Sequence, residues 1–247
     1  MILALAVMAM QDVHGVALDY KHGDVDLQGY LSYDRSVKGP RPTVLVVHEW
    51  KGHGEYVRER ARQLAKLGYL AFAIDMYGKG VYAKDHEEAG RLSGAFRNDR
   101  KKMRERAGAA LEVVKKHEVC DPKKIAAMGY CFGGTTSLEM ARAGMDVVAV
   151  ASFHGSLGTP EPAASIRAKV IVFHGADDKF VNADVAKFQD EMRAAKADWQ
   201  FVSFGGAVHS FTVKEAGDDP SKGMAYNADA DRRSWEMLKT FLAEAFQ

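Results

Sequence analysis

The segment Met128-Gly129-Tyr130-Cys131-Phe132-Gly133-Gly134 follows an apolar run at 125–128 and leads into a stretch of helical character at 135–143. Its pattern is G-x-C-x-G. In a nucleophile elbow the central residue lies on a sharp turn between a strand and a helix, and glycines flank it because side chains there would collide with both neighbours. The segment therefore predicts that Cys131 faces a cleft at a helix N-terminus, where the helix dipole favours a thiolate.

Short unbroken apolar runs recur on both sides of this segment, at 43–47, 70–74, 125–128, 147–153, 170–173 and 200–204. Such runs are typical of strands that are buried on both faces. Between them the apolar residues take helical spacing, at 57–64, 103–114, 185–195 and 235–246, and we expect Gly68 to end the first of these helices and Asn182 to cap the third. Strands alternating with helices predict an α/β class with a mostly parallel central sheet and helices on both faces.

The N-terminal part differs from the rest of the chain. Apolar residues alternate with polar ones at 16–20 and 25–31, which predicts antiparallel N-terminal strands that are buried on one face. With no linker and no repeat, residues 12–247 are expected to form a single α/β domain. Residues 1–11 are interpreted either as a signal-peptide remnant or as an edge segment, so the expected location is cytoplasmic, or periplasmic or secreted if the remnant is real.

Composition limits the function classes. The chain has 247 residues, with 34 basic and 33 acidic ones and a formal net charge of +1, so neither nucleic acid nor an anionic membrane is an expected partner. No apolar run reaches the ~18 residues of a membrane span, and we expect a soluble protein. Its two cysteines, Cys120 and Cys131, do not suggest a disulfide framework or a structural metal.

An elbow also predicts its partners, in the chain order nucleophile, acid, histidine. The run at 170–173 is followed by His174-Gly175-Ala176-Asp177-Asp178, and the run at 200–204 is followed after three residues by Val208-His209-Ser210-Phe211. The acid is either Asp177 or Asp178, of which we favour Asp178, and His209 is the candidate base. We interpret His154 and His174 as structural hydrogen-bonding residues at strand ends.

The loop after the first apolar run reads His48-Glu49-Trp50-Lys51-Gly52-His53-Gly54. An oxyanion formed by attack on a carbonyl needs two N–H donors, and we expect them from the backbones of Phe132, beside the nucleophile, and Trp50, in this loop. A carboxylate at Glu49 close to a thiol would disfavour the thiolate unless substrate altered the balance. Glu49 therefore suggests a gated nucleophile.

Two other patterns are given their simpler interpretation. Residues 97–106 are rich in basic side chains, which could form an anion-binding patch, but they continue into an apolar-striped helix and are interpreted as a solvated helix face. His48 and His53 are five residues apart in a glycine-flanked loop, whereas the zinc-protease motif needs histidines four apart on a helix. We expect no metal.

Together, the motifs around Glu49, Cys131, Asp178 and His209 resemble the dienelactone hydrolase family of α/β-hydrolases. The similarity extends from Val16 to the C-terminus and includes the stretch at 225–235. It implies that Cys131, His209 and Asp178 form a triad, that Trp50 and Phe132 supply the oxyanion N–H groups, and that Glu49 deprotonates the thiol when substrate displaces it. No cofactor is implied.

The resemblance also identifies departures that concern the substrate. Family members that cleave dienelactones have an arginine a few residues past the histidine, where this chain has Thr212-Val213-Lys214. A second expected arginine, shortly after the position of Tyr77, is replaced by Lys79, which keeps the charge but lacks the bidentate fork. We expect Tyr77, Lys79 and Tyr130 to bind substrate. These departures argue against a dienelactone itself.

The resulting hypothesis is a hydrolase of small carboxylic esters or lactones that works through a Cys-His-Asp triad and an acyl-enzyme intermediate. Its partner is a small-molecule substrate, and the protein is expected to be a monomer or a homodimer. The alternative is a non-catalytic ligand-binding or redox-sensing α/β protein in which Cys131 is oxidised rather than acylated.

Overall fold

A computed structural model describes residues 11–247, and the question of a signal remnant or edge segment at 1–10 lies outside the described residues. Eight strands form one sheet in the spatial order β1-β2-β4-β3-β5-β6-β7-β8. The strands are β1 (Val13–His22), β2 (Val25–Asp34), β3 (Arg41–Val47), β4 (Leu70–Ile74), β5 (Cys120–Tyr130), β6 (Ala149–Phe153), β7 (Lys169–Gly175) and β8 (Trp199–Phe204).

The sheet is mixed, with antiparallel strands at its N-terminal edge. β1 pairs with β2 and β2 with β4 in antiparallel fashion, whereas all pairs from β4 to β8 are parallel. The expected α/β class, with antiparallel N-terminal strands and a mostly parallel sheet, is confirmed. The register sets Val47 of β3 beside Gly129 of β5, and Gly129 beside Ser152 of β6, so the loops after these strands meet at one edge of the sheet.

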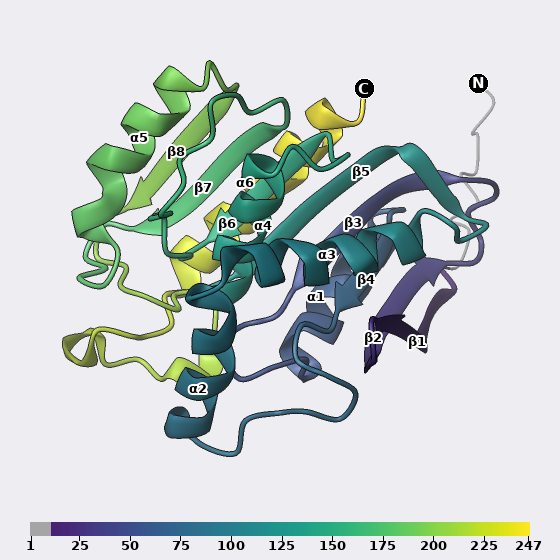
Figure 1. Ribbon diagram of the computed structural model, residues 1–247, viewed down its shortest axis with the longest axis horizontal. Coiled ribbons are helices and arrows are strands. Elements are labelled where there is room, and N and C mark those ends of the chain that lie inside the picture. The colour runs from purple at the N-terminus through teal and green to yellow at the C-terminus, as the bar shows by residue number, and fades with distance from the viewer. Residues whose placement is uncertain (1–10) are drawn as a thin grey trace, which may run out of the picture.

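Helices cover both faces of the sheet (Figure 1). The helices are α1 (Glu55–Lys66), α2 (His86–Arg97), α3 (Arg100–Val114), α4 (Phe132–Arg142), α5 (Val185–Ala194) and α6 (Ala228–Ala245). One hydrophobic cluster joins the sheet to the helices α2 to α5, and a second joins its other face to α1 and α6. This two-sided cover explains why the central strands are unbroken apolar runs.

Several sequence-based expectations for individual elements are wrong. The run at 200–204 is not buried on both faces, because β8 is an edge strand with Gln200 and Ser203 exposed. Val16 and Val25 are more than a third exposed rather than facing the core. Asn182 does not cap α5: it begins a short 3-10 helix and its side chain bonds His174 instead.

The helix α2 was not predicted, because its buried positions include small residues, Ala89 and Ser93, which give a weak apolar stripe. A capping signal was available: the side chain of Asp85 accepts a hydrogen bond from the backbone N–H of Glu88 at 2.8 Å. The helix ends at Arg97, close to the end of β5. This unpredicted helix therefore brings Arg97 to the site.

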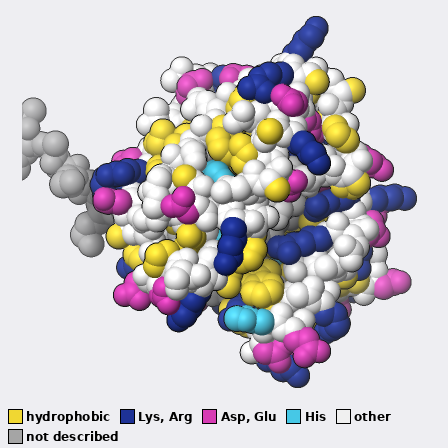
Figure 2. All heavy atoms as spheres, turned by 90° about the vertical axis from the view of Figure 1, so that its left-hand side faces the viewer, with side chains coloured by type: hydrophobic (Ala, Val, Ile, Leu, Met, Phe, Trp, Pro, Cys, Tyr) yellow, Lys and Arg dark blue, Asp and Glu magenta, His cyan; other side chains and the backbone are white. Residues whose placement is uncertain are grey.

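Figure 2 shows acidic and basic side chains interspersed on one face of the molecule. Within residues 11–247, no helix is both long enough and apolar enough to cross a membrane.

Candidate active site

Cys131 lies on a sharp turn between β5 and α4. Its φ of 51° and ψ of −111° are unfavourable for a residue with a Cβ atom, and such strain is typical of functional positions. The glycines around it are needed for space: a Cβ on Gly129 would lie 2.2 Å from the backbone of Gly133, and a Cβ on Gly133 would lie 2.2 Å from the carbonyl oxygen of Val47. The predicted elbow geometry is present, with Cys131 as the N-cap of α4.

A thiol, an imidazole and a carboxylate are aligned at this turn. The Sγ atom of Cys131 lies 3.1 Å from Nε2 of His209, and Nδ1 of His209 lies 2.7 Å from Oδ2 of Asp178. The other carboxylate oxygen of Asp178 accepts a hydrogen bond from the backbone N–H of Phe180 at 3.0 Å. Both oxygens of this fully buried carboxylate are thus held in place.

The structure distinguishes the two adjacent acids. Asp178 bonds His209 at 2.7 Å, whereas Asp177 accepts a hydrogen bond from the backbone N–H of Gly206 at 3.1 Å. His174 bonds the side chain of Asn182 at 2.7 Å. The geometry therefore matches the preference for Asp178 and the hydrogen-bonding interpretation of His174.

The surroundings change the proton affinities of two groups. Burial lowers the pKa of His209, but the nearby Cys131 and the hydrogen-bonded Asp178 outweigh burial and raise it overall, which favours a charged imidazolium. Burial raises the pKa of Glu49 to about 7, against the opposing effect of His209. The Oε1 atom of Glu49 is buried and has no hydrogen-bond partner among the described residues. Glu49 can therefore exchange a proton near neutral pH.

The loop that carries Glu49 and Trp50 is anchored from several sides. Tyr77 donates a hydrogen bond from its hydroxyl to the carbonyl oxygen of Trp50 at 2.8 Å, and its ring contacts Phe132 with 5.5 Å between centroids. His48 accepts a hydrogen bond at Nε2 from the backbone N–H of Met76 at 3.2 Å. Tyr77 thus joins the Trp50 loop to the start of α4, next to Cys131.

Arg97 corrects the interpretation of 97–106 as a solvated helix face. Its Nη2 atom lies 3.9 Å from Sγ of Cys131, and its buried Nε has no hydrogen-bond partner among the described residues. Arg106 is also buried and donates to the carbonyl oxygen of Met76 at 2.8 Å. The spacing of charges could not reveal this, because the approach of Arg97 to Cys131 depends on how the unpredicted α2 packs.

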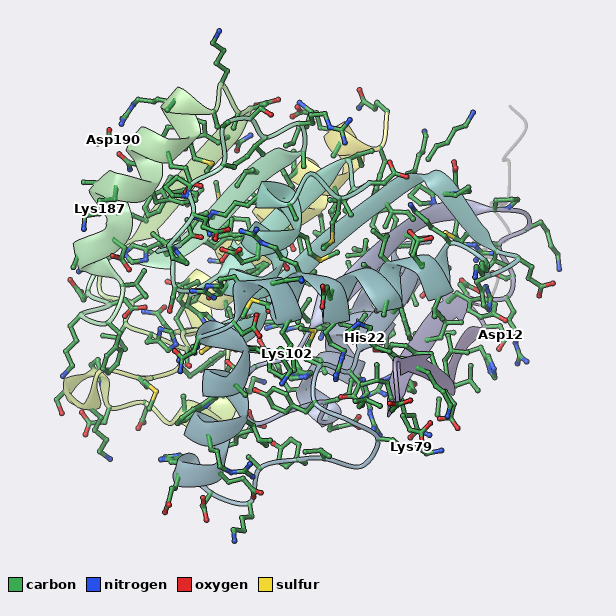
Figure 3. The ribbon with its side chains drawn as sticks, viewed as in Figure 1. Asp12, His22, Lys79, Lys102, Lys187 and Asp190 are labelled. Atoms are coloured by element: carbon green, nitrogen blue, oxygen red, sulfur yellow. The ribbon has the colours of Figure 1, made fainter. Side chains whose placement is uncertain are left out.

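Two expected substrate-binding residues are not brought to Cys131. Lys79 is exposed and pairs with Asp19 of β1 at 2.7 Å, and Figure 3 shows it beside the β1–β2 hairpin. Tyr130 is fully buried, its ring packed on Phe153 with 4.8 Å between centroids. Strand alternation explains this, because Tyr130 is directed into the cluster beneath α1 and α6, away from α4.

Within residues 11–247, neither histidine of the 48–54 loop belongs to a group of side chains that could hold a metal ion. His53 lies 3.1 Å through Nε2 from the carbonyl oxygen of Ala73, and His48 is engaged by Met76. Cys120, the other thiol, is the first residue of β5, whereas Cys131 follows its last residue. The two thiols therefore lie at opposite ends of β5, too far apart for a disulfide within the folded chain.

The mixed sheet, the elbow and the aligned thiol, imidazole and carboxylate at the carboxyl ends of the strands define an α/β-hydrolase. The chain belongs to the Dienelactone hydrolase family, whose model matches residues 27–246. It is thus a hydrolase of that family, and the expected family resemblance is confirmed.

Two solved structures and a sequence relative are similar to this chain over nearly its whole length. The chain is 38% identical to a structure described as a dienelactone hydrolase-like promiscuous phosphotriesterase P91 from metagenomic libraries, with a TM-score of 0.89 over 95% of this chain and 99% of that one. It is 36% identical to a structure called m3DLH, with a TM-score of 0.90 and the same coverage. Protein usf of Aquifex pyrophilus is 27% identical, covering 93% of this chain and 98% of that protein.

Proposed function

We propose that the protein hydrolyses small carboxylic esters or lactones, with Cys131 as the nucleophile. The observation that carries the proposal is the continuous alignment from Sγ of Cys131 through His209 to Asp178, with separations of 3.1 and 2.7 Å. Such an arrangement of nucleophile, base and orienting carboxylate is the general signature of covalent acyl transfer.

In the proposed reaction, Glu49 takes the thiol proton when substrate enters and passes it to His209 as Sγ of Cys131 bonds to the carbonyl carbon. The tetrahedral intermediate then breaks its bond to the alcohol oxygen, which takes the proton from His209, and a thioester remains on Cys131. Water attacks the thioester while His209 removes its proton, and the carboxylic acid leaves as the thiol is restored. Asp178 orients His209 throughout.

The oxyanion is proposed to rest on the backbone N–H groups of Phe132 and Trp50. Phe132 is the first residue of α4, where backbone N–H groups have no partner within the helix. The Trp50 loop is held by the hydroxyl of Tyr77 at 2.8 Å. Donors that are fixed before substrate arrives need no reorganisation during the reaction, which is the condition for effective oxyanion stabilisation.

Glu49 is proposed to control the ionisation of Cys131. Its Oε1 atom is buried without a partner and burial raises its pKa to about 7, so it can accept a proton near neutral pH when substrate enters. A charged Glu49 close to the site also opposes a permanent thiolate, whereas His209 and Arg97 favour one. The balance between these groups sets the state of the resting thiol.

Arg97 supports a preference within the ester class. Its guanidinium lies 3.9 Å from Sγ of Cys131, and it has no carboxylate partner among the salt bridges of the described residues. A carboxylate on the acyl part of the substrate could pair with it in bidentate fashion. Lys79, bound to Asp19, does not supply this charge. We therefore propose Arg97, rather than Lys79, as the cation that receives an anionic acyl group.

The test is a panel of p-nitrophenyl esters, lactones and thioesters, with the intact mass of the protein followed during turnover. We expect an acyl adduct on Cys131, and we expect Cys131→Ala to lose at least ~10³-fold in turnover while remaining folded. A redox-sensing protein would instead gain oxygen or a mixed disulfide at Cys131 and no acyl group. Turnover at the wild-type rate by folded Cys131→Ala would contradict the proposal.

A further inference from the structure

A second histidine, His154, contacts His209 from the end of the neighbouring strand β6. The two rings meet edge to face, with 5.3 Å between centroids and 65° between planes. His154 is 1% exposed, and its backbone N–H donates to the carbonyl oxygen of Phe173 at 2.8 Å. The ring is therefore held at the side of His209, where it can determine the orientation of that imidazole.

The backbone at His154 is strained in the same way as at the site itself. Four non-glycine residues among those described have positive φ: Cys131, His154, Lys196 and Ser210. Cys131 is the candidate nucleophile, Ser210 follows His209, and His154 has a φ of 40°. A left-handed backbone is unfavourable for a residue other than glycine, and such strain gathers at functional sites. Only Lys196 lies elsewhere, so strain groups His154 with the site.

A chain of hydrogen bonds holds the far side of the His154 ring. Its Nε2 lies 2.8 Å from Oγ1 of Thr212, and the same oxygen lies 2.7 Å from the hydroxyl of Tyr56 on α1. Thr212 is 1% exposed and lies three residues after His209. The loop that carries His209 thus fixes His154, which in turn packs against His209. Phe211, from the same loop, also packs against His154, with 5.2 Å between the ring centroids.

Charge also favours a neutral imidazole at His154. Burial, together with the charges of His209 and Arg60, holds the pKa of His154 well below its usual value. Tyr130, a further titratable side chain, packs against His154 with 6.0 Å between ring centroids. A neutral ring at this place does not repel the imidazolium that His209 forms during turnover.

We propose that His154 is a positioning residue: Thr212 and Tyr56 hold its ring against His209, and this keeps His209 in the orientation that meets both Cys131 and Asp178. This inference rests on the proposed function, because it concerns proton transfer by His209. It differs from the initial interpretation of His154 as a structural residue. The role of His154 is to prevent rotation of the imidazole after each proton transfer, without touching the substrate.

The main variants are His154→Phe, which keeps an aromatic ring but loses the bond to Thr212, and Thr212→Val, which keeps His154 but removes its partner. We expect each to lower kcat on a p-nitrophenyl ester by ~10- to 10²-fold with little change in KM, as is typical of misplaced catalytic groups. The pH profile of kcat/KM should shift in both. Because both act through one contact, the double variant should lose little more than either alone.

His154→Gln provides the conservative comparison, because its amide nitrogen can reach Thr212 in place of Nε2, and it should recover most of the lost kcat. His53→Phe is the matched control: His53 is also largely buried and bonds a backbone carbonyl, but its ring makes no aromatic contact with His209 among the described residues. We expect His53→Phe to leave kcat and the pH profile near those of the wild type.

Wild-type kcat and pH profile in folded His154→Phe and Thr212→Val would overturn the positioning role, even if both variants melted at a lower temperature. If His154→Phe does not fold, Thr212→Val alone decides, because it leaves the strained turn unchanged. Activity retained by Cys131→Ala would instead contradict the proposed function. Inactive Cys131→Ala together with fully active His154 and Thr212 variants would contradict only this inference.

Discussion

The two sides of Cys131 differ in how completely their polar groups are partnered. On one side His209 and Asp178 form bonds of 3.1 and 2.7 Å, and the remaining oxygen of Asp178 is satisfied by a backbone N–H. On the other side Oε1 of Glu49 and Nε of Arg97 are buried without partners among the described residues. Unsatisfied buried groups are costly, so the second side is the one prepared for a ligand.

The largest effect is expected for Asp178→Asn, which changes the partnered side, where this carboxylate bonds His209. An amide that donates to Nδ1 would hold the proton on Nε2, so His209 could no longer accept the thiol proton. We expect kcat for ester hydrolysis to fall by ~10⁴-fold with the fold retained. Asp177→Asn is the matched control, because this adjacent carboxylate bonds Gly206 rather than His209. Equal losses in both variants would contradict the assignment.

The second prediction concerns the unpartnered side. Glu49→Gln should lower ester turnover by ~10²–10⁴-fold, because His209 alone would have to ionise the thiol. In the wild type, kcat/KM should fall as pH drops below about 7, where Glu49 becomes protonated, and this limb should be absent from the variant. Resting Cys131 should react slowly with iodoacetamide. Rapid alkylation together with full activity in Glu49→Gln would mean that Cys131 is a permanent thiolate and that no gate exists.

The third prediction is about stability. Burial raises the pKa of Glu49 from 4.5 to about 7, so the folded state holds its proton more tightly than the unfolded state. The stabilisation is complete below pH 4.5 and is lost as pH rises through about 7. This loss amounts to about 3 kcal/mol. Relative to Glu49→Gln, the free energy of unfolding of the wild type should fall by this amount between pH 4.5 and 8. Denaturation curves that stay parallel across this range would refute it.

The smallest effect is expected for Arg97→Met, and it should depend on substrate. With two p-nitrophenyl esters that differ only in whether the acyl chain ends in a carboxylate, kcat/KM should fall by ~10-fold for the charged ester alone. Lys79→Met is the matched control. Because Lys79 pairs with Asp19, we expect this variant to cleave both esters at the wild-type rate. A selective loss in Lys79→Met and none in Arg97→Met would transfer the anion site to Lys79.

The partnered side of Cys131 could be predicted from the sequence, whereas the position of Arg97 on the other side could not. The alignment of Cys131, His209 and Asp178 was expected from three motifs in a fixed chain order, because the carboxyl ends of parallel strands meet at one edge of the sheet. Arg97 was misinterpreted because it ends a helix that carries only a weak apolar stripe. His154 was recognised as a strand-end residue, but its contact with His209 had no counterpart in the local sequence.

The amino-acid sequence by itself determined the α/β class, the elbow at Cys131 and the family, because these depend on the periodicity of apolar residues and on glycines required by steric contact. Only the tertiary structure decided which cation approaches Cys131, that Tyr130 turns into the core, and that His154 supports His209. These are directions of single side chains in loops and at strand ends. They follow from packing between segments far apart in the chain, which no local pattern encodes.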